Sequence, residues 1–392
     1  MSKLQKLITD LCPNGVPTFK LGELEDNKVL KLGRGDVISK TDLNDNPGSL
    51  PVYSSSAASN GLFGRYGRFM FDDERITWSI DGGGKFFYRP IHQYSVTNVC
   101  GWLKVLEPKT LITKYIYYVL ISAWGGRTYN YTVKAHPSVI REDYLIPLPP
   151  IDVQQEIVAI LDKFTQLEAE LKAELEVRKS QYEYYRSLLL SFRDTEEDGV
   201  RWIPLRDICE YRKERSKPSA GTFMYVGVED LLQERRGVSE SARFVSSTGH
   251  DIFMPGDVLL GNIRPYLKKV WRADVEGRTN GDVLVITPKP EALTELDTSY
   301  LYFLLSSDDF FGYCVQTSKG AKMPRGDKQA ILRYEVPIPS IEVQKRVVKV
   351  LTAFEKLTQD LEVGLPAEIA ARQSQYEYYR SKLLTFKELD VA

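Results

Sequence analysis

Two long stretches of the chain carry apolar residues at alternating steps of three and four, the spacing that places them on one face of an α-helix. In the stretch 151–195 this face consists of Ile157, Ile160, Phe164, Leu167 and Leu171, followed by Tyr182, Tyr185, Leu189 and Phe192. In the stretch 339–387 it consists of Val347, Val350, Phe354, Leu357 and Leu361, followed by Tyr376, Tyr379, Leu383 and Phe386. Narrow stripes of this kind, with Glu and Lys on the other faces, are typical of a coiled coil. The pattern therefore predicts two long helices that pair antiparallel.

The two stretches are copies of each other. Both begin with the lead-in Pro-x-Pro-x-Ile-x-x-Gln, at 147–154 and 337–344, and both contain the octapeptide Ser-Gln-Tyr-Glu-Tyr-Tyr-Arg-Ser, at 180–187 and 374–381. An identity of this length and composition indicates an internal duplication. The copies are 190 residues apart at the lead-in and 194 apart at the octapeptide, so the second contains four extra residues. Gly364 and Pro366 lie in this insertion, and they predict a kink or a break there.

Fainter echoes extend the duplication to the rest of the chain. Thr113-x-Tyr115-x-Tyr117 is repeated as Thr298-x-Tyr300-x-Tyr302. Short β-rich runs such as 75–80 and 257–260 alternate with Gly-rich turns, and the segments 113–122 and 298–307 are typical of short helices. We predict an α+β fold with internal pseudo-twofold symmetry. Two mixed modules, at 1–150 and 196–338, alternate with the two helices, at 151–195 and 339–387.

Composition narrows the class of protein. The chain has 392 residues, of which 43% are hydrophobic, enough to bury real cores. The formal net charge of −1 does not indicate a nucleic-acid ligand, although it leaves room for local basic patches. The four cysteines lie far apart and form no Cys-x-x-Cys pair, so no disulfide framework or zinc knuckle is expected. No apolar signal core follows Met1 and no run reaches the roughly 18 apolar residues of a membrane span, so we expect a cytoplasmic protein.

The duplicated helix motif resembles the conserved regions of the specificity subunits of type I restriction–modification enzymes. Three segments of the modules, at 101–105, 281–285 and 320–325, also resemble the target-recognition domains of that family. The resemblance covers essentially the whole chain. It implies a subunit for bacterial defence, in which each recognition domain reads one half of a bipartite, asymmetric sequence in double-stranded DNA.

The same resemblance implies the partners. The helices would act as a ruler for the unread spacer and would dock two copies of an adenine methyltransferase subunit, which restriction subunits then join. The chain itself is expected to bind no cofactor. S-adenosylmethionine, ATP and Mg are implied for the partner subunits, which would carry out DNA methylation and cleavage.

Motifs for catalysis are missing from the sequence. An adenine methyltransferase needs Asn/Asp-Pro-Pro-aromatic, whereas the one Pro-Pro pair lies in Leu148-Pro149-Pro150-Ile151. Asp81-Gly82-Gly83-Gly84-Lys85 lacks the spacing of a phosphate-binding loop, and no Gly-x-Ser-x-Gly elbow is present. The three histidines, His92, His136 and His250, are isolated and have no metal-ligand spacing. We therefore expect a non-catalytic subunit.

Candidate DNA contacts are basic, amide and aromatic residues in loops, because Arg and Lys hold phosphates or read guanine and amides read adenine. In the first module the loop 125–134 offers Arg127, Tyr129, Asn130 and Lys134, and a second set is Ser55, Asn60, Lys85 and Arg89. In the second module the candidates are Lys319, Lys322, Arg325 and Lys328, together with Arg264, Tyr266 and Lys268. The competing interpretation of every one of these residues is an ordinary solvated side chain.

The repeated tyrosine pairs have two possible roles. Tyr185 and Tyr379 belong to the apolar stripes and are predicted to pack within the helix pair, whereas Tyr184 and Tyr378 point elsewhere and could contact a partner. A rival function from another class is a protein-binding scaffold, with two adaptor modules on a coiled coil and no DNA. Salt-dependent DNA binding would separate the two functions.

Overall fold

The computed structural model describes residues 3–56, 59–125, 127, 129–130, 132–192, 199–214, 222–239, 243–246, 250–359 and 363–389. The chain divides into two compact units. The first contains Met1–Glu170 and Ala370–Ala392, and the second contains Leu171–Ile369. Each unit is a mixture of strands and helices, and two long helical stretches alternate with the modules along the chain, as the repeat predicts.

The core of the first unit is a four-stranded antiparallel sheet with the order β2-β8-β5-β6. Its strands are β2 (Leu30–Arg34), β5 (Arg75–Ser79), β6 (Phe86–Arg89) and β8 (Cys100–Val105). A second sheet has the order β4-β3-β7, in which β3 (Leu50–Tyr53) is antiparallel to β4 (Leu62–Tyr66) and parallel to β7 (Ser95–Val96). The pair β1 (Thr18–Lys20) and β9 (Leu145–Pro147) joins the two ends of the module.

The second unit repeats this arrangement, with one additional strand, β14, in its smaller sheet. Its main sheet has the order β11-β18-β15-β16, from β11 (Cys209–Tyr211), β15 (Val258–Gly261), β16 (Val270–Arg272) and β18 (Val283–Pro288). Its other sheet has the order β13-β12-β17-β14, with β12 (Thr222–Val226), β13 (Arg243–Ser246), β14 (Asp251–Phe253) and β17 (Gly277–Thr279). The pair β12–β17 is parallel, like β3–β7. The pair β10 (Arg201–Pro204) and β19 (Glu335–Ile338) closes the module. The duplication seen in the helices therefore includes the modules.

Short helices cover the sheets in each unit. In the first unit they are α2 (Leu21–Asp26), α3 (Lys40–Asp45), α4 (Thr113–Trp124) and α5 (Pro137–Asp143). In the described part of the second unit they are α7 (Leu205–Ile208), α8 (Thr298–Leu305), α9 (Asp308–Gln316) and α10 (Lys328–Arg333), together with the 3-10 turns η2 (Pro265–Leu267) and η3 (Pro290–Thr294). The helices predicted at 113–122 and 298–307 are α4 and α8.

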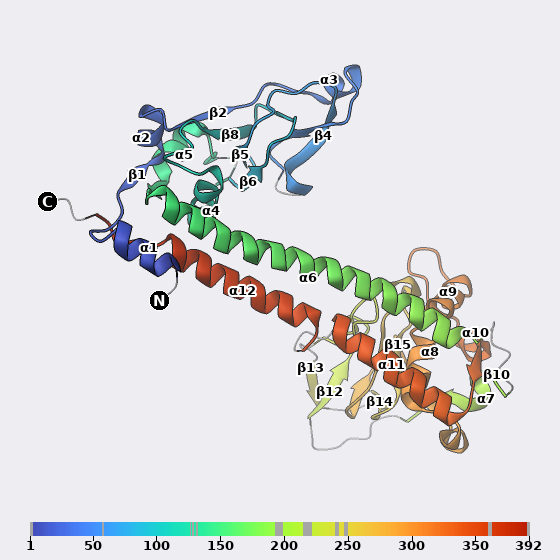
Figure 1. The fold of residues 1–392 in the computed structure, drawn as a ribbon. Coiled ribbons are helices and arrows are strands. Elements are labelled where there is room, and N and C mark those ends of the chain that lie inside the picture. The colour runs from blue at the N-terminus through green and yellow to red at the C-terminus, as the bar shows by residue number, and fades with distance from the viewer. Residues whose placement is uncertain are drawn as a thin grey trace. The chain divides into compact units, whose positions relative to one another are not determined.

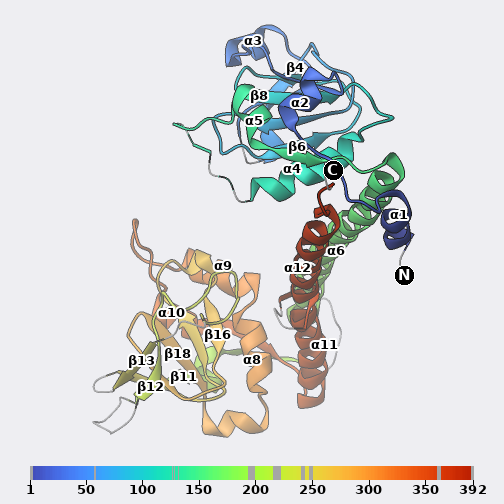
Figure 2. The ribbon, with the colours of Figure 1, turned by 90° about the vertical axis from the view of Figure 1, so that its left-hand side faces the viewer.

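The long predicted helices are α6 (Ile151–Ser191) in the first copy and α11 (Ile341–Gln359) with α12 (Leu365–Leu384) in the second. The second copy is broken between Gln359 and Leu365, at the predicted insertion; Leu361 lies outside the described residues. In the first unit α6 runs beside α12 (Figures 1 and 2), and Phe164 stacks on Tyr379 with ring centroids 5.5 Å apart. In the second unit α6 packs on α11, and Phe354 stacks on Tyr185 at 5.6 Å.

An N-terminal helix, α1 (Lys3–Leu11), was not expected from the sequence. It lies beside the end of α12 in the first unit (Figure 1). Leu4 is buried in the same apolar core as Leu384 of α12 and Ile157 of α6. Lys3 also forms an ion pair with Glu156 at 2.5 Å. The two ends of the chain are therefore both part of the first unit.

Candidate nucleic-acid interface

The loop 125–134 of the first unit connects α4 to α5. Gly126, Thr128 and Tyr131 lie outside the described residues. Tyr129 is only 7% exposed, and its hydroxyl donates to Asp143 Oδ2 at 2.9 Å. The ring of Tyr129 therefore packs inside the unit and is not presented at the surface; its contact with DNA stays a prediction. Arg127 is half-buried over the ring of Tyr144, 4.5 Å from its centroid, and donates to the carbonyl of Asp143.

Two candidates of this loop remain at the surface. The Oδ1 atom of Asn130 accepts from the backbone N–H groups of Thr132 and Val133, both at 2.8 Å, so the side chain shapes its own turn. Lys134 is exposed, and its Nζ lies 3.0 Å from Asp81 Oδ1. The carboxylate of Asp81 thus already compensates the charge of Lys134, and a DNA phosphate would have to displace this carboxylate.

The second set of candidates in the first unit surrounds Arg89, and most of it is not exposed. Arg89 is 1% exposed; its Nε donates to Thr77 Oγ1 at 2.9 Å and its NH2 group to the carbonyl of Asn60 at 2.9 Å. Burial lowers the pKa of this guanidinium. The side chain of Arg89 therefore fills the interior below the Asn60 turn instead of lying at the surface; its contact with DNA stays a prediction. Asn60 itself is exposed, while Ser55 and Lys85 are half-buried.

In the second unit the structure brings two separate candidate loops together. The backbone N–H of Arg264 donates to the carbonyl of Pro324 at 2.7 Å, and Ile263 forms an isolated bridge with Arg325. Lys319 and Arg325 exchange backbone hydrogen bonds, both at 2.9 Å. Segments 60 or more positions apart in the sequence therefore meet, and the side chains of Tyr266, Lys322 and Lys328 in or next to them are exposed.

Carboxylates already hold several of these cations. Arg325 pairs with Asp282 at 3.1 Å, and Lys319 pairs with Asp327 at 2.6 Å. The hydrogen bonds from Lys319 and from the N–H groups of Ala330 and Gln329 lower the pKa of Asp327 to about 2. Such pairs fix the directions of the long side chains at an exposed surface, and they explain how basic loops coexist with a near-neutral chain.

Comparison with known proteins decides the family. A family model described as the type I restriction modification DNA specificity domain matches residues 13–177 and 198–371, once in each copy of the repeat. The chain belongs to this specificity family. It is 31% identical over 307 residues to the EcoR124I/EcoR124II specificity subunit of Escherichia coli, covering 71% of this chain and 72% of that protein. It is 24% identical over 388 residues to a putative type I specificity subunit of Mycoplasma pneumoniae, covering 95% and 98%.

Solved structures show the same fold. The S subunit of a type I restriction–modification system from M. genitalium matches with a TM-score of 0.58 at 15% sequence identity, covering 94% of this chain and 96% of that one. A chain from a study of complex assembly and conformational transition in a type I system matches with a TM-score of 0.55 at 14% identity, covering 95% and 98%. The chain is thus a type I specificity subunit with DNA-recognition domains, the non-catalytic component of such a complex.

The repeated tyrosines of this specificity subunit divide as their positions predict. Tyr185 and Tyr379 stack on Phe354 and Phe164 within their units. Tyr184 and Tyr378 are 64% and 60% exposed, each in an edge-to-face pair with the following tyrosine. Around Tyr184 the surface of α6 forms a shallow groove, to which Val177 and Gln181 also contribute.

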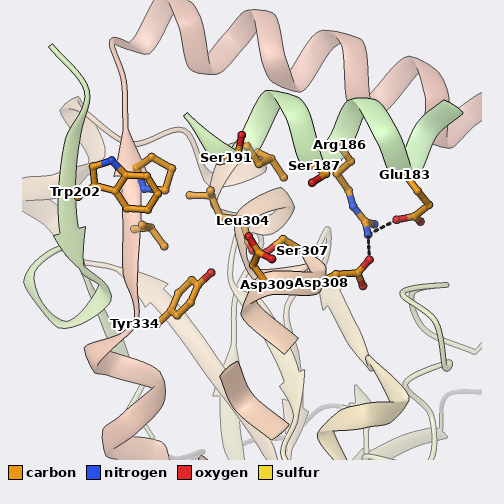
Figure 3. A pocket seen from close by; sticks show the side chains of 13 residues that line it. Glu183, Arg186, Ser187, Ser191, Trp202, Leu304, Ser307, Asp308, Asp309 and Tyr334 are labelled. Atoms are coloured by element: carbon orange, nitrogen blue, oxygen red, sulfur yellow. Dashed lines mark hydrogen bonds and ion pairs between the residues drawn. The ribbon is translucent and has the colours of Figure 1, made fainter. Parts of the chain in front are cut away.

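One charged cluster of the specificity subunit was missed at the sequence level. Arg186 of α6 is 3% exposed and lies between the carboxylates of Glu183 and Asp308 (Figure 3), at 2.5 Å and 3.6 Å. A cavity of about 70 Å³ opens beside it, lined in part by Trp202, Leu304 and Tyr334. The repeated octapeptide includes Arg186 and so marked this position in the sequence. Asp308 lies in no repeated motif, so the sequence did not indicate that the two residues form an ion pair.

Across the described ranges, no group of three or more His, Cys, Asp or Glu side chains could hold a metal ion. Within the same part of the chain, every helix is too short or too polar to cross a bilayer. The four cysteines are buried and unpaired by disulfides, and burial raises the pKa of Cys100, Cys209 and Cys314 to about 12.

Proposed function

We propose that each unit of this specificity subunit reads one half of a bipartite, asymmetric sequence in double-stranded DNA. The observation that carries the proposal is a shared fold with different loop residues. Trp78 pairs with Phe86 in the first unit as Leu260 pairs with Val270 in the second, so Lys85 corresponds to Lys269. The turns between these strands differ in length and sequence, at 80–84 and 262–268. Two related surfaces with different side chains suit two related half-sites with different bases.

The exposed residues of each unit have two different roles in the proposed recognition. Lys319, Lys322 and Arg325 in the second unit, and Lys134 in the first, supply phosphate contacts and hence salt-dependent affinity. Arg264, Tyr266 and Asn130 present side chains that can meet base edges. Individual exposed cations contribute little by themselves, so affinity comes from their sum and sequence choice from the loop geometry.

The chain performs this function in a complex. Two adenine methyltransferase subunits dock on the helical repeats, near Tyr184 and Tyr378, and restriction subunits complete the assembly. Methylation uses S-adenosylmethionine and cleavage uses ATP and Mg, all bound by the partners. The specificity subunit decides where this chemistry occurs, and the flipped adenine is processed in the methyltransferase.

Single-molecule sequencing of methylated adenines tests the proposal in the source cell. Deleting the gene should abolish methylation at one bipartite motif, and the wild-type gene should restore it. Complementing the deletion with a gene that encodes Arg325→Ala should relax or weaken the requirement for one half of the motif. A gene that encodes Lys134→Ala should affect the other half. If an active methyltransferase partner is expressed and no motif changes on deletion, the proposal is rejected and a protein-binding scaffold is favoured. Equal loss at both halves with Arg325→Ala would contradict modular recognition.

A further inference from the structure

A single carboxylate in the second unit is shared by three cations from three separate segments. Asp308, the first residue of α9, accepts from Lys268 Nζ at 2.8 Å and from the NH2 group of Arg235. Its other oxygen lies 3.6 Å from the NH2 group of Arg186 (Figure 3). Glu183 of α6 holds the two arginines from the other side, at 2.5 Å from Arg186 and 3.4 Å from Arg235. Asp308 therefore connects helix α6 to two surface turns.

Both of these turns have backbone conformations that need external support. Arg264 and Lys268, on either side of η2, have φ values of 55° and 50°, and Glu234 and Arg235 have φ values of 55° and 62°. Residues other than glycine rarely adopt this left-handed region. The two turns hold each other through backbone hydrogen bonds, from Arg235 to Lys268 at 2.9 Å and from Glu234 to Leu267 at 3.0 Å. Their side chains then converge on Asp308, which is the group positioned to stabilise this shape.

The charges of the cluster also need one another. Arg186 and Arg235 are 3% and 7% exposed, and a buried guanidinium is costly without a carboxylate. Although partial burial acts to raise it, the hydrogen bond from Lys268 and the charge of Arg235 hold the pKa of Asp308 below its usual range. Asp308 thus stays ionised, and in the protein without DNA its carboxylate compensates the charge of Lys268.

We propose that Asp308 is a positioning residue for DNA recognition by the second unit. It holds the turn 264–268, with Arg264 and Tyr266, in the conformation that reads bases, and it keeps Lys268 from contacting phosphate indiscriminately. The inference rests on the proposed function, and it deepens that function by naming a residue that sets sequence discrimination without contacting DNA. Removing the charge of Asp308 frees Lys268 for any phosphate and lets the turn relax, so affinity for unrelated DNA rises while discrimination falls.

Among the described residues, the contact between Asp308 and Lys268 has no equivalent in the first unit. The turn 80–84 of the first unit lies between β5 and β6 as 262–268 lies between β15 and β16, but it is shorter and contains no lysine; by the repeated Thr-x-Tyr-x-Tyr motif the position of Asp308 corresponds to Ala123. At these two places the first unit therefore has neither the lysine nor the carboxylate. A change at Asp308 is expected to alter recognition of one half-site and to leave the other as it is.

The test uses the full chain in complex with its methyltransferase subunits, on duplexes containing the motif found by methylation sequencing. Affinities are measured over a range of salt for the intact motif, for each half substituted and for unrelated DNA. For Asp308→Asn we expect the discrimination against DNA with a substituted half-site of the second unit to fall about tenfold. This is about the loss of affinity that one mismatched base pair causes. Affinity for unrelated DNA should rise, with a salt slope steeper by about one ion, the signature of one added phosphate contact.

Asp309→Asn is the matched control. Asp309 is the next residue of α9, is exposed and forms no ion pair with any described residue, so the substitution makes the same change in net charge. If the Asp308→Asn and Asp309→Asn variants discriminate equally well between the intact motif and DNA with a substituted half, the inference is overturned. Asp308→Glu should restore discrimination in part, because it restores a carboxylate to Lys268 and Arg235.

A second variant covers the case in which Asp308→Asn does not fold. Lys268→Met keeps the apolar stem but removes the charge that Asp308 holds, so discrimination at the second half should fall with no gain in affinity or salt slope. Unchanged discrimination in this variant also overturns the inference. If the wild-type complex itself shows no preference for the bipartite motif, the proposed function fails instead, and the two failures are distinguished.

Discussion

Gln154 and Gln344 make the same three hydrogen bonds at equivalent places in the two units. Gln154 Nε2 donates to the carbonyls of Pro149 at 2.8 Å and Thr110 at 2.9 Å, and its Oε1 accepts from the N–H of Ile112 at 3.0 Å. Gln344 repeats these contacts with Pro339, Glu295 and Asp297, at 2.9, 2.7 and 2.9 Å. Both side chains are fully buried. The glutamine of the repeated lead-in therefore ties the start of each long helix to the loop before α4 or α8.

Gln344→Leu should destabilise the second unit by roughly 2 kcal/mol or more, because it leaves two carbonyls and one N–H buried without partners. Denaturant unfolding of the full chain measures the loss, and hydrogen exchange should locate it in the second unit. Gln166→Leu is the control, since Gln166 is exposed on α6. Its effect should stay within about 0.5 kcal/mol. Equal effects of the two substitutions would contradict the assigned role of Gln344.

Arg89 and Arg75 lie opposite each other on paired strands but differ in charge compensation. Arg75 pairs with Asp73 at 2.6 Å and its guanidinium lies 3.6 Å from the ring centroid of Phe71. Arg89 has no carboxylate within ion-pair distance among the described residues. We expect Arg75→Met to cost about 2 kcal/mol, and Arg89→Met to change stability by less than about 1 kcal/mol or to increase it, because removing an uncompensated buried charge offsets the lost hydrogen bonds. Thermal unfolding checks the order of the two variants, and a larger loss for Arg89→Met would refute it.

Glu355 makes stability depend on pH in an unusual direction. Tyr182 and Tyr302 donate to its Oε1 at 2.9 Å and 3.3 Å, but burial outweighs these bonds and raises the pKa of the carboxyl. A glutamate that titrates higher when folded binds more protons in the folded state, so the stability of wild type falls as pH rises from the ordinary glutamate value to the raised one. Glu355→Gln keeps the acceptor and removes this decline. Unfolding free energies from pH 4 to pH 8 test it: parallel curves for wild type and variant would exclude the role.

Tyr184 and Tyr185 are neighbours with different expected roles. Tyr184→Ala should lower the affinity for the methyltransferase subunit at least tenfold without changing stability, because an exposed aromatic side chain is a common anchor in interfaces. Tyr185→Ala should instead lower the unfolding temperature, since its ring stacks on Phe354. Titration of each purified variant with the partner subunit, alongside thermal unfolding, measures both. Unchanged partner affinity for Tyr184→Ala would remove this residue from the docking surface.

The helical half of the molecule was predictable from the sequence, because helix periodicity is a local property. The stripes, the duplicated octapeptide and the positions of Gly364 and Pro366 suffice to place α6, the break before α12 and the inward faces of Tyr185 and Tyr379. Recognition of the family from the same motifs was confirmed by the match in both copies. Helix α1 was not predicted, although Leu4, Leu7, Ile8 and Leu11 have helix spacing in the sequence; the structure adds that Leu4 is buried in the same core as Leu384 at the other end of the chain.

The loops were different, because exposure depends on neighbours that are distant along the chain. Residue type marks Tyr129, Arg89 and Lys268 alike as candidate DNA contacts, yet Asp143 and Gly84 enclose the first, Thr77 and Asn60 the second, and Asp308 forms an ion pair with the third. By itself the sequence determined the duplication, the helices and the family. Only the tertiary structure decided which cations face solvent and which are paired, because burial and ion pairing arise when segments separated by tens of residues fold together.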